Sequence, residues 1–152
     1  MLSGIYENSI DARNRIVVPQ ELRSQIVNEN GEVWLTYSPD ACVRIYSCEV
    51  YDSLVEKIAK AQSEGRDTRA MQILFIKPAR KVVLDGGGRV FLSSDMRDRA
   101  KIVTDASEGK IETAVVGNID HLEIWLKAEL NAQTQAITEE MGFNELRSIG
   151  LT

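Results

Sequence analysis

The sequence is poor in the residues that build metal centres and most catalytic sites. It holds two cysteines and one histidine among 152 residues. Five residues separate Cys42 from Cys48, and no second cysteine pair or nearby histidine completes a zinc ligand set. His121 has no serine, cysteine or carboxylate constellation that the sequence spacing supports. We therefore identify no metal, cofactor, small-molecule substrate or catalytic residue, and we expect both cysteines to be reduced.

Long apolar segments are missing as well. The strongest apolar run, Ile73–Ile76, is far shorter than the roughly 20 residues that a membrane-spanning helix needs. Residues 1–7 do not combine a basic start with a long apolar stretch, as a secretory signal would. These observations predict a soluble cytoplasmic protein with no membrane partner.

An excess of positive charge is also absent. The net charge of −5 and the pI of about 5.0 argue against a protein that coats nucleic acid through bulk positive charge. The charge is nevertheless sorted along the chain, because residues 66–81 carry five basic side chains against one acid, whereas residues 120–145 carry six acids against one lysine. The basic segment suits a solvated helix face, a salt-bridge surface between subunits or a phosphate-contacting surface.

The chain does contain one turn that is written twice. The motif Asp-x-x-x-Arg occupies residues 11–15 (DARNR) and 85–89 (DGGGR), each between apolar runs typical of β-strands. Across residues 10–23 and 84–97, five further positions are apolar in both copies and three are identical. The identical pairs are Asp11 and Asp85, Arg15 and Arg89, and Arg23 and Arg97. The offset of 74 residues indicates a tandem duplication in which each half is one structural unit.

Both copies show the same order of elements: strand, turn, strand, short helix, strand, strand. In the first copy a strand ends at Ile10, and the continuous apolar character of Ile16–Val18 predicts a second strand that is buried on both faces. Pro19 suits the first turn of the short helix that follows. The other expected segments are a helix over 20–26, strands over 33–37 and 42–46, strands near 80–84 and 89–92, a helix that begins at Ser93 or Ser94, and strands near 111–117 and 121–125.

Helices are expected between the two copies and after the second one. Residues 49–62 have an apolar stripe, with Ser47 as the N-cap, and a second helix is expected over 68–76 with Asp67 as its cap. One amphipathic C-terminal helix is expected to end at Gly142, with its apolar face packed internally or between subunits. The apolar residues of that helix are Leu126, Leu130, Ile137 and Met141.

Each turn contains residues that fix a tight hairpin loop. Its aspartate can accept hydrogen bonds from the following backbone N–H groups, and Asn14 and Gly88 tolerate the positive φ that such turns need. The glycines of the second turn lack the lysine and the helix of a phosphate-binding P-loop. We therefore expect loop-shaping roles for Asp11, Asn14, Asp85, Gly86, Gly87 and Gly88.

The arginines of the turns have two interpretations. Arg15 and Arg89 lie where the chain re-enters a strand, so each guanidinium projects from a rigid base, and Arg13 adds a second charge in the first copy only. They could simply brace the hairpins through exposed Asp–Arg pairs worth about 0–1 kcal/mol. Bracing needs neither repetition nor the extra arginine, whereas paired arginine loops can grip phosphates and read guanine edges. We therefore interpret Arg13, Arg15 and Arg89 as DNA-binding residues.

With these motifs the sequence resembles the MraZ family. The resemblance rests on the two Asp-x-x-x-Arg turns, each followed by an apolar strand and a short helix that contains Leu22-Arg23 or Met96-Arg97, and it covers nearly the whole chain. It implies an α+β fold of tandem duplicated AbrB-like swapped-hairpin units, also called a double-split β-barrel, with connecting and C-terminal helices. The implied divisions are repeat one (1–47), a helical connector (48–77), repeat two (78–125) and a C-terminal helical segment (126–152).

The resemblance also implies a function. Such a protein would be a nucleoid-associated, sequence-specific transcriptional regulator of the bacterial division and cell-wall gene cluster. It would bind repeated boxes of double-stranded DNA upstream of that cluster, including its own gene, as a ring-shaped homo-oligomer. The alternative is a protein-interaction or antitoxin-type scaffold with the same hairpin fold and no specific DNA recognition.

Two positions depart from the family pattern. Asn14 replaces the glycine that usually precedes the first arginine, and Lys81 stands where the family more often has an acid. Asparagine still permits the left-handed conformation. Gly87 occupies the position that Arg13 has in the first turn, which suggests that repeat one makes the stronger DNA contact.

Overall fold

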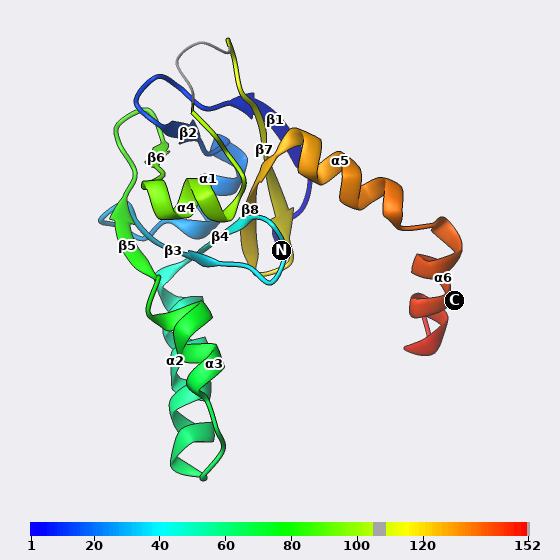
Figure 1. Ribbon diagram of the computed structural model, residues 1–152. Coiled ribbons are helices and arrows are strands. Elements are labelled where there is room, and N and C mark those ends of the chain that lie inside the picture. The colour runs from blue at the N-terminus through cyan, green and yellow to red at the C-terminus, as the bar shows by residue number, and fades with distance from the viewer. Residues whose placement is uncertain (105–108, 152) are drawn as a thin grey trace.

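Two antiparallel β-sheets form the centre of the computed structural model, which describes residues 1–104 and 109–151, and helices extend from them in two directions (Figure 1). The strands are β1 (Ile5–Ser9), β2 (Arg15–Val17), β3 (Glu32–Tyr37), β4 (Val43–Tyr46), β5 (Arg80–Val83), β6 (Arg89–Phe91), β7 (Glu112–Asn118) and β8 (His121–Leu126). The helices are α1 (Gln20–Ile26), α2 (Cys48–Ser63), α3 (Arg69–Met71), the π-helix η1 (Gln72–Ile76), α4 (Ser94–Arg99), α5 (Lys127–Ala136) and α6 (Glu139–Ser148). This is an α+β architecture. None of the helices in the described part of the chain has both the length and the apolarity to cross a membrane.

The two halves of the chain are interlocked through their strands. The larger sheet has the order β1-β7-β8-β4-β3-β5, so the equivalent strands β1 and β5 form its two edges and β4 and β8 form its centre. Strand β1 pairs with β7 of the second half, from Ile5 opposite Val116 to Ser9 opposite Glu112, and β5 pairs with β3 of the first half. The smaller sheet joins β2 to β6. Each half therefore completes the sheets of the other.

A single core is shared by both halves. The matched positions Ile16 and Val90 are fully buried, and so are Val18 and Leu92. Helix α1 buries Leu22 and Ile26 as its spacing predicts, and α4 buries Met96 at the matched position. Burial of one such side chain is worth about 1.5–3 kcal/mol, so this shared core accounts for much of the stability of the fold.

The strand over Ile16–Val18 is not buried on both faces, and that prediction was wrong. Strand β2 pairs only with β6, which leaves a two-stranded ribbon with one open face. Ile16 and Val90 point inward, whereas Val17 is 44% exposed and Phe91 is 53% exposed. Asn8 of β1 donates a side-chain hydrogen bond of 2.8 Å to the Val17 carbonyl and so ties the ribbon to the larger sheet.

The helices between the two halves form a hairpin that projects from the sheets (Figure 1). Ser47 caps α2 as predicted, because its hydroxyl accepts a hydrogen bond of 3.1 Å from the Val50 N–H. The second helix differs from the expected α-helix over 68–76, since it begins as α3 and widens into the π-helix η1. The Phe75 carbonyl accepts hydrogen bonds from the hydroxyls of Thr36, at 2.7 Å, and Tyr51, at 3.0 Å. These bonds hold η1 against β3 and α2.

The C-terminal segment contains two helices, and the prediction of one helix that ends at Gly142 was wrong. The chain is extended at Ile137, and Thr138 begins α6 by accepting a hydrogen bond of 3.2 Å from the Met141 N–H. Two glutamates in the first turn also favour a helix start there, because negative charge stabilises a helix N-terminus. Gly142 lies inside α6, and Ile137 and Met141 are about half exposed. Leu126 packs against the core, so only the far part of the expected apolar face, at Ile137 and Met141, is left open.

Candidate nucleic-acid interface

The two repeated turns stand at opposite ends of the ribbon made by β2 and β6. Arg15 lies opposite Phe91, Ile16 opposite Val90, and Val17 opposite Arg89. The hydrogen bonds that frame the ribbon repeat in the same way, since the Val18 N–H donates to the Gly88 carbonyl and the Leu92 N–H donates to the Asn14 carbonyl, both at 2.9 Å. The duplication thus places equivalent turns about an approximate two-fold axis.

Each aspartate fixes its turn through one carboxylate oxygen, which accepts two backbone hydrogen bonds. Oδ1 of Asp11 accepts hydrogen bonds of 2.9 Å from the backbone N–H groups of Arg13 and Arg15. Oδ1 of Asp85 accepts the corresponding bonds from Gly87, at 2.9 Å, and Arg89, at 3.0 Å. The last residue before each arginine is left-handed, with φ 61° at Asn14 and φ 73° at Gly88. The departure from glycine at position 14 thus leaves the turn geometry intact.

These hydrogen bonds lower the pKa of both carboxyls. Burial alone would raise the pKa of Asp11, but the hydrogen bonds from Arg15 and Arg13 outweigh it and bring the pKa below the ordinary aspartate value of 3.8. For Asp85 the backbone hydrogen bond from Arg89 is the largest influence, and it lowers the pKa below 3.8. Both groups are therefore anionic at neutral pH and remain acceptors for the arginines.

Arg15 and Arg89 are partly engaged by these aspartates. Nε of Arg15 lies 2.9 Å from Oδ2 of Asp11, and Nε of Arg89 lies 2.8 Å from Oδ2 of Asp85. Arg15 also reaches across the ribbon, with Nη1 at 3.2 Å from Oδ2 of Asp85. The bracing interpretation thus describes real contacts. Because a guanidinium has five N–H donors, these bonds leave donors on both arginines for another acceptor.

Arg13 differs from the other two arginines. Its backbone N–H is held by Asp11, but its residue is exposed. Within residues 1–104 and 109–151, its guanidinium forms no ion pair with a carboxylate. Arg13 is therefore the arginine of the first turn that is most available to an external phosphate or base.

Arg23 and Arg97 also lie at the candidate interface, and they were not included in it from the sequence. The Arg23 side chain lies against the opposite turn, since a Cβ placed on Gly88 would overlap its Nη1 atom. Nη1 of Arg97 donates to the Leu92 carbonyl at the end of β6. Arg23 and Arg97 form one of the three identical pairs between the repeats, and this identity is the signal that could have found them. Val17 and Phe91 were also missed, and they share the open ribbon face with Arg15 and Arg89.

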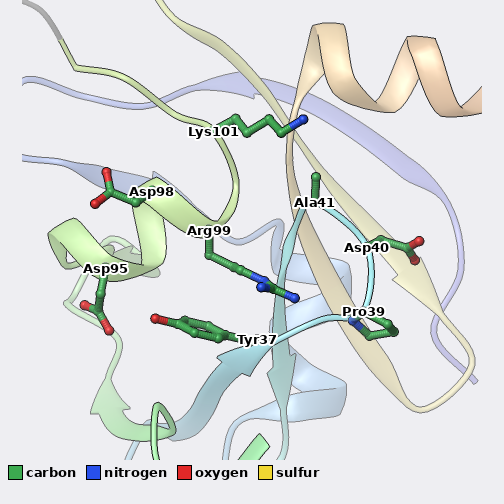
Figure 2. A pocket seen from close by; sticks show the side chains of 8 residues that line it. All are labelled: Tyr37, Pro39, Asp40, Ala41, Asp95, Asp98, Arg99 and Lys101. Carbon is green, nitrogen blue, oxygen red and sulfur yellow. The ribbon is translucent and has the colours of Figure 1, made fainter. Parts of the chain in front are cut away.

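A hollow lies beside α4, and none of its lining residues belongs to β2 or β6. Figure 2 shows Arg99 of α4 extended between the Tyr37 ring and the loop at Pro39. The guanidinium lies 5.0 Å from the centre of the Tyr37 ring and donates a hydrogen bond of 2.6 Å to the Ser38 carbonyl. Lys101 pairs with Glu129 of α5 at 3.5 Å. The contacts of Arg99 fasten α4 to the end of β3 and the loop that follows it, and the Lys101 pair joins the segment after α4 to α5.

His121 and Cys42 are both buried side chains. The imidazole is buried, with Nδ1 at 2.8 Å from Asp120 and Nε2 at 3.1 Å from Glu123. Burial would raise the pKa of Glu123, but hydrogen bonds from His121, Trp125 and Asn118 lower that pKa to about 2. Cys42 is a free buried thiol, and burial raises its pKa to about 12. Such a thiol is a poor nucleophile at neutral pH.

Comparison with known proteins places this chain beside proteins of one family. A family model described as "MraZ protein, putative antitoxin-like" matches residues 1–74. A protein of Caldanaerobacter subterraneus subsp. tengcongensis named "Transcriptional regulator MraZ" is 30% identical over 145 residues, which cover 93% of this chain and 94% of the relative. A protein of Lactobacillus helveticus with the same name is 28% identical over 140 residues, which cover 92% and 91%. These relatives are named as regulators of transcription and not as enzymes. The chain belongs to the MraZ family.

Proposed function

We propose that this protein is a transcriptional regulator that binds specific sequences of double-stranded DNA through the open face of the β2–β6 ribbon. The observation that carries the proposal is the placement of both arginine turns on that one ribbon. A two-stranded ribbon fits the major groove of B-DNA, which is about 12 Å wide. The names of the relatives support the regulatory role.

The residues of the ribbon suit different parts of DNA recognition. Arg13 is exposed and suits a phosphate or a guanine edge. Arg15 and Arg89 each keep N–H donors for DNA, while the ion pairs with the aspartates fix the direction of the guanidinium groups. Phe91, which lies opposite Arg15, can contact a thymine methyl group. Because Gly87 stands where the first turn has Arg13, the first turn makes the stronger contact.

Self-assembly would explain how a protein with a net charge of −5 can bind DNA. If several copies form a ring, their ribbons can face one DNA surface while the acidic C-terminal segments lie elsewhere. Weak contacts from each copy then act together through effective concentration. The exchange of β1 and β5 between halves agrees with two AbrB-like swapped-hairpin units over 1–47 and 78–125, joined by a connector over 48–77 and followed by a C-terminal segment over 126–152.

The family membership suggests which genes such a regulator would control. We assign it to the division and cell-wall gene cluster, with repeated DNA boxes upstream of that cluster and of its own gene. A regulator of this kind would act in the cytoplasm, on the nucleoid.

A DNA-binding titration with two arginine variants tests the proposal. We expect Arg13→Ala to weaken binding to the DNA upstream of the protein's own gene about 5- to 150-fold, which corresponds to about 1–3 kcal/mol. Arg69→Ala, which removes an exposed arginine from the helical hairpin, is the matched control and should change affinity little. Equal losses in the two variants would indicate binding through bulk charge or through phosphate contacts of the basic segment over 66–81. A scaffold without DNA recognition would bind this DNA and a shuffled sequence equally.

A further inference from the structure

The C-terminal arm, α5 and α6, ends in a helix that buries none of its residues and exposes apolar side chains. Helix α5 is held to the body by Gln133, which donates a hydrogen bond of 3.0 Å to Asp40, and by the pair of Lys101 with Glu129. Helix α6 starts after a link of two residues and leads away from the sheets (Figure 1). Phe143 on α6 is 51% exposed. Since isolated helices shorter than about 12–15 residues are marginal in water, this ten-residue helix needs a surface to pack on.

An apolar groove of suitable character lies elsewhere on the molecule. It has a volume of about 480 Å³ and lies between the helical hairpin and the sheet face formed by β3 and β4. Leu54 and Ile58 of α2 line one side, and Met71 and Leu74 of α3 and η1 line another. Leu74 is 50% exposed. The groove thus offers apolar side chains that nothing in the chain covers within residues 1–104 and 109–151.

The charges of the groove and of α6 are opposite. The groove is lined by the cationic side chains of Arg44, Lys57 and Arg99, and none of its lining residues is acidic. Helix α6 carries three glutamates against one arginine. Its apolar residues Phe143 and Leu146 are three positions apart and therefore share a face. An acidic helix with an apolar face is the kind of ligand that a cation-rimmed apolar groove binds.

We propose that α6 of one copy docks into the groove of a second copy of this chain. The anchored α5 directs α6 away from the helical hairpin that borders the groove, so the two surfaces of one chain face different neighbours (Figure 1). Because donor and acceptor surfaces differ, the contact is head-to-tail, and such contacts close into rings when the rotation between copies permits it. This inference rests on the proposed self-assembly and supplies its interface.

Light scattering after size-exclusion chromatography of four full-length variants tests the docking. Leu74→Glu places a charge in the groove, and Phe143→Glu places one on the docking face of α6. The matched controls are Ile73→Glu, which changes the 55% exposed neighbour of Leu74 outside the groove, and Asn144→Glu, which lies next to Phe143 beside Arg147. We expect the wild type and both controls to form multimers, and Leu74→Glu and Phe143→Glu to run as single chains of 17.0 kDa.

Mixing the two dissociated variants gives a sharper result. The Leu74→Glu chain keeps an intact α6 and the Phe143→Glu chain keeps an intact groove, so an equimolar mixture can form one good contact and no more. We expect a complex of twice the single-chain mass, whose formation also shows that both variants are folded. A mixture that stays at the single-chain mass would overturn the docking.

Other outcomes separate this inference from the proposed function. If Leu74→Glu and Phe143→Glu keep the wild-type mass, or if the controls dissociate as they do, α6 docks on its own chain or another surface holds the assembly, and the inference is wrong. If the wild type is itself a single chain, both the docking and the proposed assembly are wrong. The DNA titration with Arg13→Ala decides the DNA-binding function in either case.

Discussion

Gly88 provides a quantitative test of two features of the second turn: its left-handed backbone and its contact with Arg23. It has φ 73°, and a Cβ placed on it would overlap Nη1 and Cζ of Arg23. The substitution Gly88→Ala therefore adds a left-handed non-glycine residue, at a cost of about 1–2 kcal/mol, and forces the Arg23 side chain to move. Since 1 kcal/mol shifts the Tm of a chain of this size by about 2–4 °C, we expect the Tm to fall by about 2–8 °C.

A second substitution separates the backbone cost from the displacement of Arg23. Gly88→Asn copies the first turn, where Asn14 accepts φ 61°. The backbone cost is then small, and the remaining loss reports the displaced guanidinium. That remaining loss should disappear when Gly88→Asn is compared with its parent in an Arg23→Ala background.

Thermal unfolding followed by circular dichroism is the assay for these variants. All of them are compared at one protein concentration, because self-assembly makes Tm depend on concentration. A Gly88→Ala protein that melts with the wild type would refute the left-handed turn. A loss in Gly88→Asn that persists without the Arg23 side chain would refute the contact between that arginine and the second turn.

Three further predictions concern pH, salt and the two turns. Because the pKa of Glu123 is about 2 in the folded chain against an ordinary 4.5, its stabilisation is complete above about pH 4.5 and is lost as the pH falls towards 2. Glu123→Gln should abolish that part of the pH dependence, of the order of 3 kcal/mol, in urea titrations. The logarithm of DNA affinity should fall steeply with the logarithm of salt concentration, and Arg13→Ala should lower the slope by about 1; a flat response would reject phosphate contact. Arg15→Ala should weaken operator binding more than Arg89→Ala, since only Arg15 contacts both aspartates and only the first turn has a second arginine; equal losses would contradict the unequal roles of the turns.

The sequence predicted the local elements well because the duplication repeats their patterns. The helix over 49–62 and its cap at Ser47 follow from spacing and capping chemistry alone. The exposed side of β2 could not be predicted, because Ile16-Val17-Val18 has the same apolar pattern whether one face or both are covered. The exchange of strands between halves is likewise a matter of pairing over long distances, which no local pattern contains.

The geometry of the two turns was predicted in part for the same reason, and the DNA-binding role of their arginines stays a prediction. The repeated turns identified the aspartates and arginines, but their ion pairs depend on how β2 and β6 align. Arg23 lies near Gly88 only because α1 of the first half packs beside the turn of the second. The break between α5 and α6 depends on the extended conformation of Ile137 and on the cap at Thr138, which compete with an otherwise helical pattern.

Sequence discrimination by the wild-type protein shows whether the β2–β6 ribbon reads DNA. The measurement is a pair of DNA titrations at about 150 mM salt, one with the DNA upstream of the protein's own gene and one with a shuffled sequence of the same composition. A specific regulator binds its site at least about 10³-fold more tightly than other DNA, and we expect that ratio or more. Equal affinity for the two DNAs, or no binding to either, would contradict the assignment of the arginine ribbon as a DNA-reading surface.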